Sequence, residues 1–160
     1  MRRVAALVQI TPAHTMARGA PGDLAAWDAL AEGLEHGGVE GFIDAWEPKV
    51  ADEWLDTAHR IARERLSQHR DLRAVARALR VVPRSAAFNG LDELESVEVP
   101  TLVVGSRDEA DPGHPLSVAE AYAERLPNAE LVVEREGESP LAWQGGRLSR
   151  AIAAFLEGLR

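Results

Sequence analysis

The chain has 160 residues, a length that suits one domain with its own core. It contains no cysteine, which excludes disulfides, thiol catalysis and cysteine-ligated zinc. Its formal net charge of −8 disfavours nucleic acid as a partner, because nucleic-acid-binding surfaces are basic. No apolar run approaches the roughly 20 residues that span a bilayer, so we expect a cytoplasmic protein that does not bind membranes.

The first predicted element is a strand over 4–10, where the sequence VAALVQI is followed by Thr11 and Pro12. A short and almost wholly apolar run is typical of a buried parallel strand. Two arginines before the run suggest a signal peptide, but Gln9 interrupts the run and leaves it too short. With a buried strand so near Met1, we expect the chain to begin in the middle of an architecture.

A block with helical periodicity follows over 20–90. Asp23 is placed to cap its first helix, and Gly37 and Gly38 end that helix. Pro83 closes the last one. Within the block, apolar residues at helical spacing predict segments over 23–35, 39–46, 52–68 and 71–79.

Strands and helices alternate in the last third of the chain. The expected order is a strand over 101–105, a helix over 116–126, a strand over 130–134 and a helix over 147–159. Such alternation predicts a parallel sheet with right-handed crossovers. The predicted fold class is therefore α/β, a three-stranded parallel sheet with flanking helices and a helical insertion, forming a single domain over 1–160.

Several phrases of this sequence resemble the α/β-hydrolase family. They are VPTLVVG at 99–105, LPNA at 126–129 and AFL at 154–156. The resemblance is good over 97–160 and moderate over 1–96. It implies a partial α/β-hydrolase fold in which the first strand follows the nucleophile helix and residues 20–90 form the cap, or lid.

The resemblance also implies where catalytic residues lie. The family has an acid shortly after Gly105, and Asp108 fits this position. Where the family has histidine, as Gly-His-Ser, this sequence has Glu138 between Gly137 and Ser139. We interpret Glu138 either as an altered acid/base residue or as a loop carboxylate at a lost triad. A glutamate with a pKa of about 4.3 is a poor base for a hydroxyl unless it is strongly perturbed.

No Gly-x-Ser-x-Gly elbow, which would hold a nucleophilic serine, occurs in the sequence. We therefore expect a truncated or degenerate hydrolase that is inactive as an isolated chain. Asp108, Asp111 and His114 form a weak metal pattern that is more typical of a solvated loop whose acids cap the next helix. Alternatively, His114 substitutes for the missing base. We predict no metal and no cofactor.

Three residues are candidates for contact with a substrate. His14 follows Pro12 at the mouth of the expected pocket, while Trp27 and Trp54 lie in the helical block. The tryptophans either line an apolar pocket or pack between lid helices. The arginines over 60–84 either attract an anionic partner or cover a solvated helix face.

By resemblance, the function is esterase-like or carbon–carbon hydrolase-like, with a small apolar or ester-like ligand. The alternative is a non-catalytic module that uses the same fold to bind a small molecule or a protein. Without the strand that precedes it in the family, the strand over 4–10 has an unprotected edge. We therefore expect a homo-oligomer, most simply a homodimer, or binding of the missing N-terminal half in trans.

Overall fold

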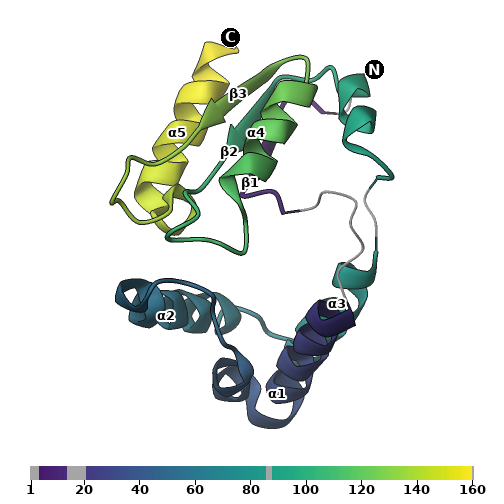
Figure 1. Ribbon diagram of the computed structural model, residues 1–160, viewed down its shortest axis with the longest axis vertical. Coiled ribbons are helices and arrows are strands. Elements are labelled where there is room, and N and C mark those ends of the chain that lie inside the picture. Colours follow the sequence, from purple (N-terminus) through teal and green to yellow (C-terminus); the bar gives the residue numbers. More distant parts are fainter. Residues whose placement is uncertain (1–3, 14–20, 86–87, 160) are drawn as a thin grey trace. The chain divides into compact units, whose positions relative to one another are not determined.

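The computed structural model describes residues 4–13, 21–85 and 88–159 (Figure 1). The chain divides into two compact units. One comprises Met1–Met16 and Phe88–Arg160 and contains the sheet, and the other, Ala17–Ala87, has only helices among its described regular elements. The helical unit nearly coincides with the predicted insertion over 20–90. Its role as a lid, and the assignment of the chain to a single domain, stay predictions.

The sheet is parallel and has the order β1-β2-β3, with β1 at Leu7–Ile10, β2 at Thr101–Val104 and β3 at Ala129–Val132. All four residues of the central strand β2 are buried. Its pairing is in register with both neighbours, so that Val103 lies between Gln9 and Leu131. The predicted fold class, a three-stranded parallel sheet with helices, is confirmed for the described residues.

Alternate side chains of β2 reach two separate apolar clusters. Val103 packs with residues of α4 (Leu116–Arg125), among them Tyr122, which is 5% exposed. Leu102 and Val104 pack with Phe155 of α5 (Gly145–Gly158). Because side chains alternate across a strand, α4 and α5 cover opposite faces of the sheet (Figure 1).

The first strand, β1, is less buried than its apolar sequence predicts. The exposed fractions of Val4, Leu7 and Ile10 are 53%, 37% and 38%. Leu7 donates its N–H to Pro100 O at 2.9 Å, and Thr11 donates to Val104 O at 2.7 Å. Because N–H groups alternate along a strand, those of Val8 and Ile10 point away from β2. The prediction of a buried strand is therefore wrong: within the described residues, β1 is paired on one side only.

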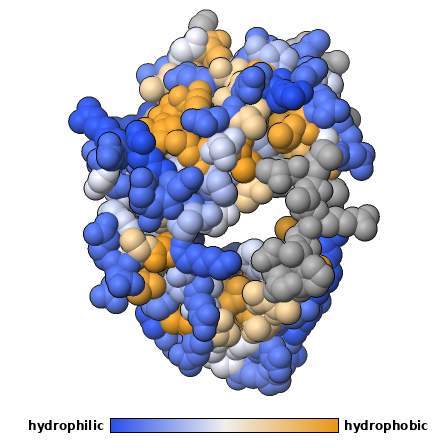
Figure 2. Space-filling model, viewed as in Figure 1, coloured by the Kyte–Doolittle hydropathy of each residue, from blue (hydrophilic) through white to orange (hydrophobic). Residues whose placement is uncertain are grey.

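Both units also display apolar atoms at their surfaces (Figure 2). In the sheet unit these include Leu131 of β3 and Leu156 and Leu159 near the end of the chain, each more than a third exposed. In the helical unit, Val81 and Val82 are each 64% exposed. None of the helices in the described ranges combines the length and the apolar character that a membrane crossing requires.

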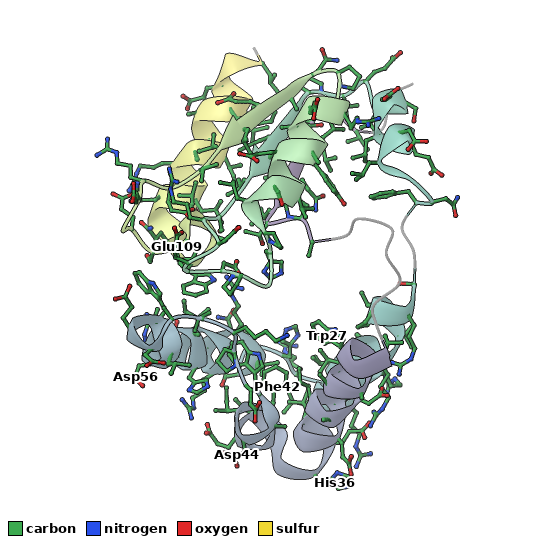
Figure 3. The ribbon with its side chains drawn as sticks, viewed as in Figure 1. Trp27, His36, Phe42, Asp44, Asp56 and Glu109 are labelled. Atoms are coloured by element: carbon green, nitrogen blue, oxygen red, sulfur yellow. The ribbon has the colours of Figure 1, made fainter. Side chains whose placement is uncertain are left out.

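The helical unit contains α1 (Pro21–Ala45), α2 (Leu55–Leu66) and α3 (Leu72–Val81). The helix α1 is broken at Gly38, whose φ of 61° and ψ of −146° are not helical. This is the boundary that the two glycines predict. Ala31, Leu34 and Ala76 form the buried core of the unit, and Phe42, labelled in Figure 3, packs against it.

The two segments of α1 approach each other through two glycines. A Cβ built on Gly41 would lie 2.2 Å from Gly33 O, and one built on Gly33 would lie 2.2 Å from Gly41 O. Both obstacles are backbone atoms, which cannot rotate away as a side chain can. The folded-back path of α1 therefore requires glycine at both positions.

We predict that Gly41→Ala lowers the free energy of unfolding by about 2–3 kcal/mol, because the new methyl group collides with backbone and forces the segments apart. Gly37→Ala is the matched control, since no atom lies within 4 Å of its Cβ position. This control should be neutral or slightly stabilising. Urea unfolding followed by circular dichroism measures both, and equal stability of the two variants would contradict the close glycine contact.

Candidate functional site

The candidate site lies at the carboxyl edge of the sheet, where ligands bind in open α/β folds. The loop after β2 contains Asp108, Asp111 and His114, and the loop after β3 contains Glu138. Because β2 and β3 are parallel neighbours, both loops leave the sheet at the same edge. The topology thus places the catalytic candidates Asp108 and Glu138 at the same edge as Asp111 and His114 of the weak metal pattern.

A buried carboxylate, Glu134, connects the two loops. Its side chain accepts the N–H of Arg107 at Oε1, at 2.5 Å, and the N–H of Leu141 at Oε2, at 3.2 Å. The residue is only 2% exposed. The Arg107 guanidinium also donates from Nε to the carbonyl oxygen of Glu134 at 3.2 Å. Glu134 therefore fixes the start of the loop that bears Asp108 and the end of the loop that bears Glu138.

Sequence reasoning missed Glu134, which was included only as the last residue of a predicted strand. The available signal is a charged residue directly after the apolar run Leu131-Val132-Val133. A buried carboxylate must be hydrogen-bonded, because burial without partners is costly. This requirement could have identified Glu134 as an acceptor, although it could not have identified the two N–H donors.

Asp108 is exposed and accepts the N–H of Leu116 at Oδ1, at 2.6 Å. Leu116 is the first residue of α4, so Asp108 satisfies a free N–H at the positive end of the helix dipole. The interpretation that an acid of this loop caps the next helix is confirmed for Asp108. Its role as the triad acid stays a prediction.

Glu138 forms an ion pair with Arg147, whose Nη1 lies 2.7 Å from Oε2. The same oxygen accepts the N–H of Arg135 at 3.3 Å. The hydrogen bond from Arg147, the largest of these influences, lowers the pKa of Glu138 below its usual value. A carboxylate with a lowered pKa is a weak proton acceptor near neutral pH. The ion pair therefore favours the loop-carboxylate interpretation of Glu138, while its catalytic role stays a prediction.

Asp111 and His114 form a pair within the loop after β2. His114 Nδ1 lies 2.8 Å from Asp111 Oδ1, and the backbone N–H of His114 donates to Asp111 O at 3.0 Å. The Asp111 side chain is 11% exposed and that of His114 is 44% exposed. Among the residues described, no group of three or more His, Asp or Glu side chains could hold a metal ion.

The three candidates for substrate contact lie outside these loops. His14 falls outside the described residues. Trp27 projects from α1 in the helical unit and is 39% exposed (Figure 3). Trp54 is half-buried directly before α2. Their contact with a substrate stays a prediction. A pocket in the sheet unit is instead lined by residues of β3, of α5 and of the segment between them, including Val132, Arg147 and Arg150.

No protein-family model matches the chain, and no curated protein sequence matches it. Several solved structures, in contrast, match its fold. An esterase from Thermogutta terrifontis matches with a TM-score of 0.69 and 20% identity, covering 98% of this chain and 57% of that one. MenH from S. aureus matches with a TM-score of 0.69 and 22% identity over 98% of this chain and 60% of its own.

A third match is the enol-lactonase from Burkholderia xenovorans, with a TM-score of 0.63, 17% identity, and coverage of 97% and 57%. The chain has a partial α/β-hydrolase fold. It spans less than two thirds of each of these three structures. The resemblance noted in the sequence is thus confirmed at the level of the fold, and identities of this size show the fold alone.

In this partial hydrolase fold, we predict that Glu134→Ala lowers the free energy of unfolding by about 3 kcal/mol. The substitution removes the acceptor of two N–H groups, and an unsatisfied buried donor costs about 1–3 kcal/mol. Asp108→Ala is the control, because its single contact is an exposed cap whose loss costs about 1 kcal/mol. Urea unfolding measures both variants, and a smaller loss for Glu134→Ala than for Asp108→Ala would contradict this ranking.

Proposed function

We propose that this chain is the acid-bearing half of an α/β-hydrolase-type protein that acts on esters or on carbon–carbon bonds next to a carbonyl. Asp108 is the triad acid in this proposal, and a small apolar or ester-like molecule is the ligand. Acyl transfer further requires a nucleophilic serine and an oxyanion hole, and no Gly-x-Ser-x-Gly elbow occurs in these 160 residues. The isolated chain is therefore inactive in this proposal.

The observation that carries this proposal is the arrangement of loops at the carboxyl edge of β2 and β3. Asp108 lies in the loop after the central strand β2, and Glu138, in the loop after β3, stands where the resemblance implies a histidine. The solved structures that share this fold include an esterase and an enol-lactonase. Catalysis in such a fold depends on side chains presented by loops at this edge.

A non-catalytic function is the second candidate, and the ion pair of Glu138 with Arg147 favours it. A base must be free to take a proton, whereas this carboxylate is held in its charged form. A module of this kind would bind a small molecule or a protein through the same fold. Ligand binding without turnover, after the missing half is supplied, would distinguish it from the hydrolase.

We predict that the purified chain hydrolyses p-nitrophenyl acetate and p-nitrophenyl butyrate no faster than buffer does. The sequence has no elbow serine, and Glu138 is a weak base beside Arg147. Release of p-nitrophenolate measures the rate. Saturable turnover that disappears in Glu138→Ala, but persists in the control Glu136→Ala on the same loop, would show that Glu138 is a working base.

The partner in this proposal binds along the free edge of β1. The N–H groups of Val8 and Ile10 point away from β2, and Leu7 and Ile10 are partly exposed. An apolar edge without proline or an inward charge recruits another strand. The partner is a second copy of this chain, joined most simply as a two-fold dimer, or the missing N-terminal half of the fold.

We predict that light scattering at tens of micromolar finds the 160-residue chain as a dimer or larger. Ile10→Pro should shift it toward monomer, because proline removes an N–H from the free edge while the Leu7 and Thr11 bonds to β2 remain. Ile10→Val keeps that N–H and is the matched control. A monomer of about 17 kDa for all three proteins would rule out association through this edge.

A further inference from the structure

The loop after β2 contains a histidine whose surroundings match those of a catalytic base. Its Nδ1 is 2.8 Å from the carboxylate of Asp111. A carboxylate oxygen can only accept, so Nδ1 carries the hydrogen of this bond. The neutral imidazole then has its lone pair on Nε2, which is the tautomer that a histidine base requires.

The structure also holds this pair in place. Asp111 donates its N–H to Arg107 O at 3.2 Å, and Arg107 in turn donates its own N–H to Glu134. Asp111 is 8% exposed as a residue, whereas His114 exposes 44% of its side chain. The carboxylate is therefore shielded and fixed, while the imidazole is accessible. This is the division of roles between an orienting acid and a base.

The other two carboxylates of the site are engaged differently. Asp108 accepts the N–H of Leu116 at the start of α4. Glu138 is held by Arg147, which lowers its pKa. Of the groups described in these two loops, His114 alone is an imidazole, and it is paired with an orienting carboxylate.

We propose that His114 is the proton-transferring base of this site and that Asp111 orients it, in place of the residue at position 138. This proposal rests on the hydrolase function proposed above. In acyl transfer, His114 Nε2 takes the proton of the nucleophilic serine's hydroxyl group. The serine oxygen bonds to the acyl carbon in the same step. The same nitrogen then returns the proton to the leaving group as the scissile bond breaks. Asp111 keeps its charge throughout and stabilises the imidazolium.

The test uses a reaction that needs a base but neither a serine nor an oxyanion hole. In the elimination of 5-nitrobenzisoxazole, a base removes the ring C–H proton, the electron pair forms a nitrile, and the N–O bond breaks to release a phenolate. The proton passes from the base to solvent, so the reaction needs no other reagent. The absorbance of the phenolate measures the rate.

We expect the full chain to accelerate this elimination about tenfold over the His114→Gln variant near neutral pH, a modest effect for a positioned base. Glutamine retains an N–H that can donate to Asp111, which favours correct folding. His69→Gln, which removes an exposed histidine of the helical unit, is the matched control and should react like the parent chain. Equal rates for the parent chain and His114→Gln would overturn the proposal.

A second variant tests the orienting role. Asp111→Asn should lower the elimination rate and move the hydrogen of neutral His114 from Nδ1 to Nε2, as 15N chemical shifts report. An unchanged rate together with an unchanged tautomer would exclude Asp111 as the orienting acid. Because the elimination involves no ester, its outcome is independent of the ester assays. Failure of the base assignment is thus distinguishable from failure of the hydrolase function.

Discussion

The candidate site depends on one buried carboxylate. Glu134 lies just after β3 and accepts the backbone N–H groups of Arg107 and Leu141. Arg107 lies in the loop after β2 and Leu141 lies in the segment after β3, so this one carboxylate joins the two. Burial strengthens both bonds and makes their loss expensive. The loops that bear the polar side chains of this edge are therefore joined by a residue that has no direct part in the proposed chemistry.

The carboxylates around Glu134 have different partners: two bind structural groups, and one binds an imidazole. Asp108 neutralises the start of α4, and Glu138 is neutralised by Arg147. Asp111 is paired with the imidazole of His114. A proton acceptor must be able to change its charge, and a group locked in an ion pair changes its charge reluctantly. The pairing thus gives Asp108 and Glu138 a structural role and leaves proton transfer to His114, although all three lie at the same edge of the sheet.

Much of the fold could be predicted because its signals are local. The apolar run Thr101–Val104 is a buried strand as expected, and Gly38 interrupts α1 where a glycine pair stands. The exposure of β1 could not be read from its sequence, since it depends on which strands lie beside it. The role of Glu134 and the pairing of His114 with Asp111 are likewise tertiary facts, because no periodicity indicates which N–H or imidazole a carboxylate meets.

The arginines of the helical unit show the same limit of sequence reasoning. Arg63 forms a two-pronged contact with Glu40, and Arg80 forms one with Glu35, whereas Arg84 donates from Nη2 to Asp28 Oδ2. All three acids lie on α1, whereas the arginines lie on or beside α2 and α3. Each exposed pair adds little stability. Together, however, they join α1 to the segments that follow it, and they neutralise part of a run that looks strongly basic in sequence. This pairing favours a structural function for these arginines over attraction of an anionic partner.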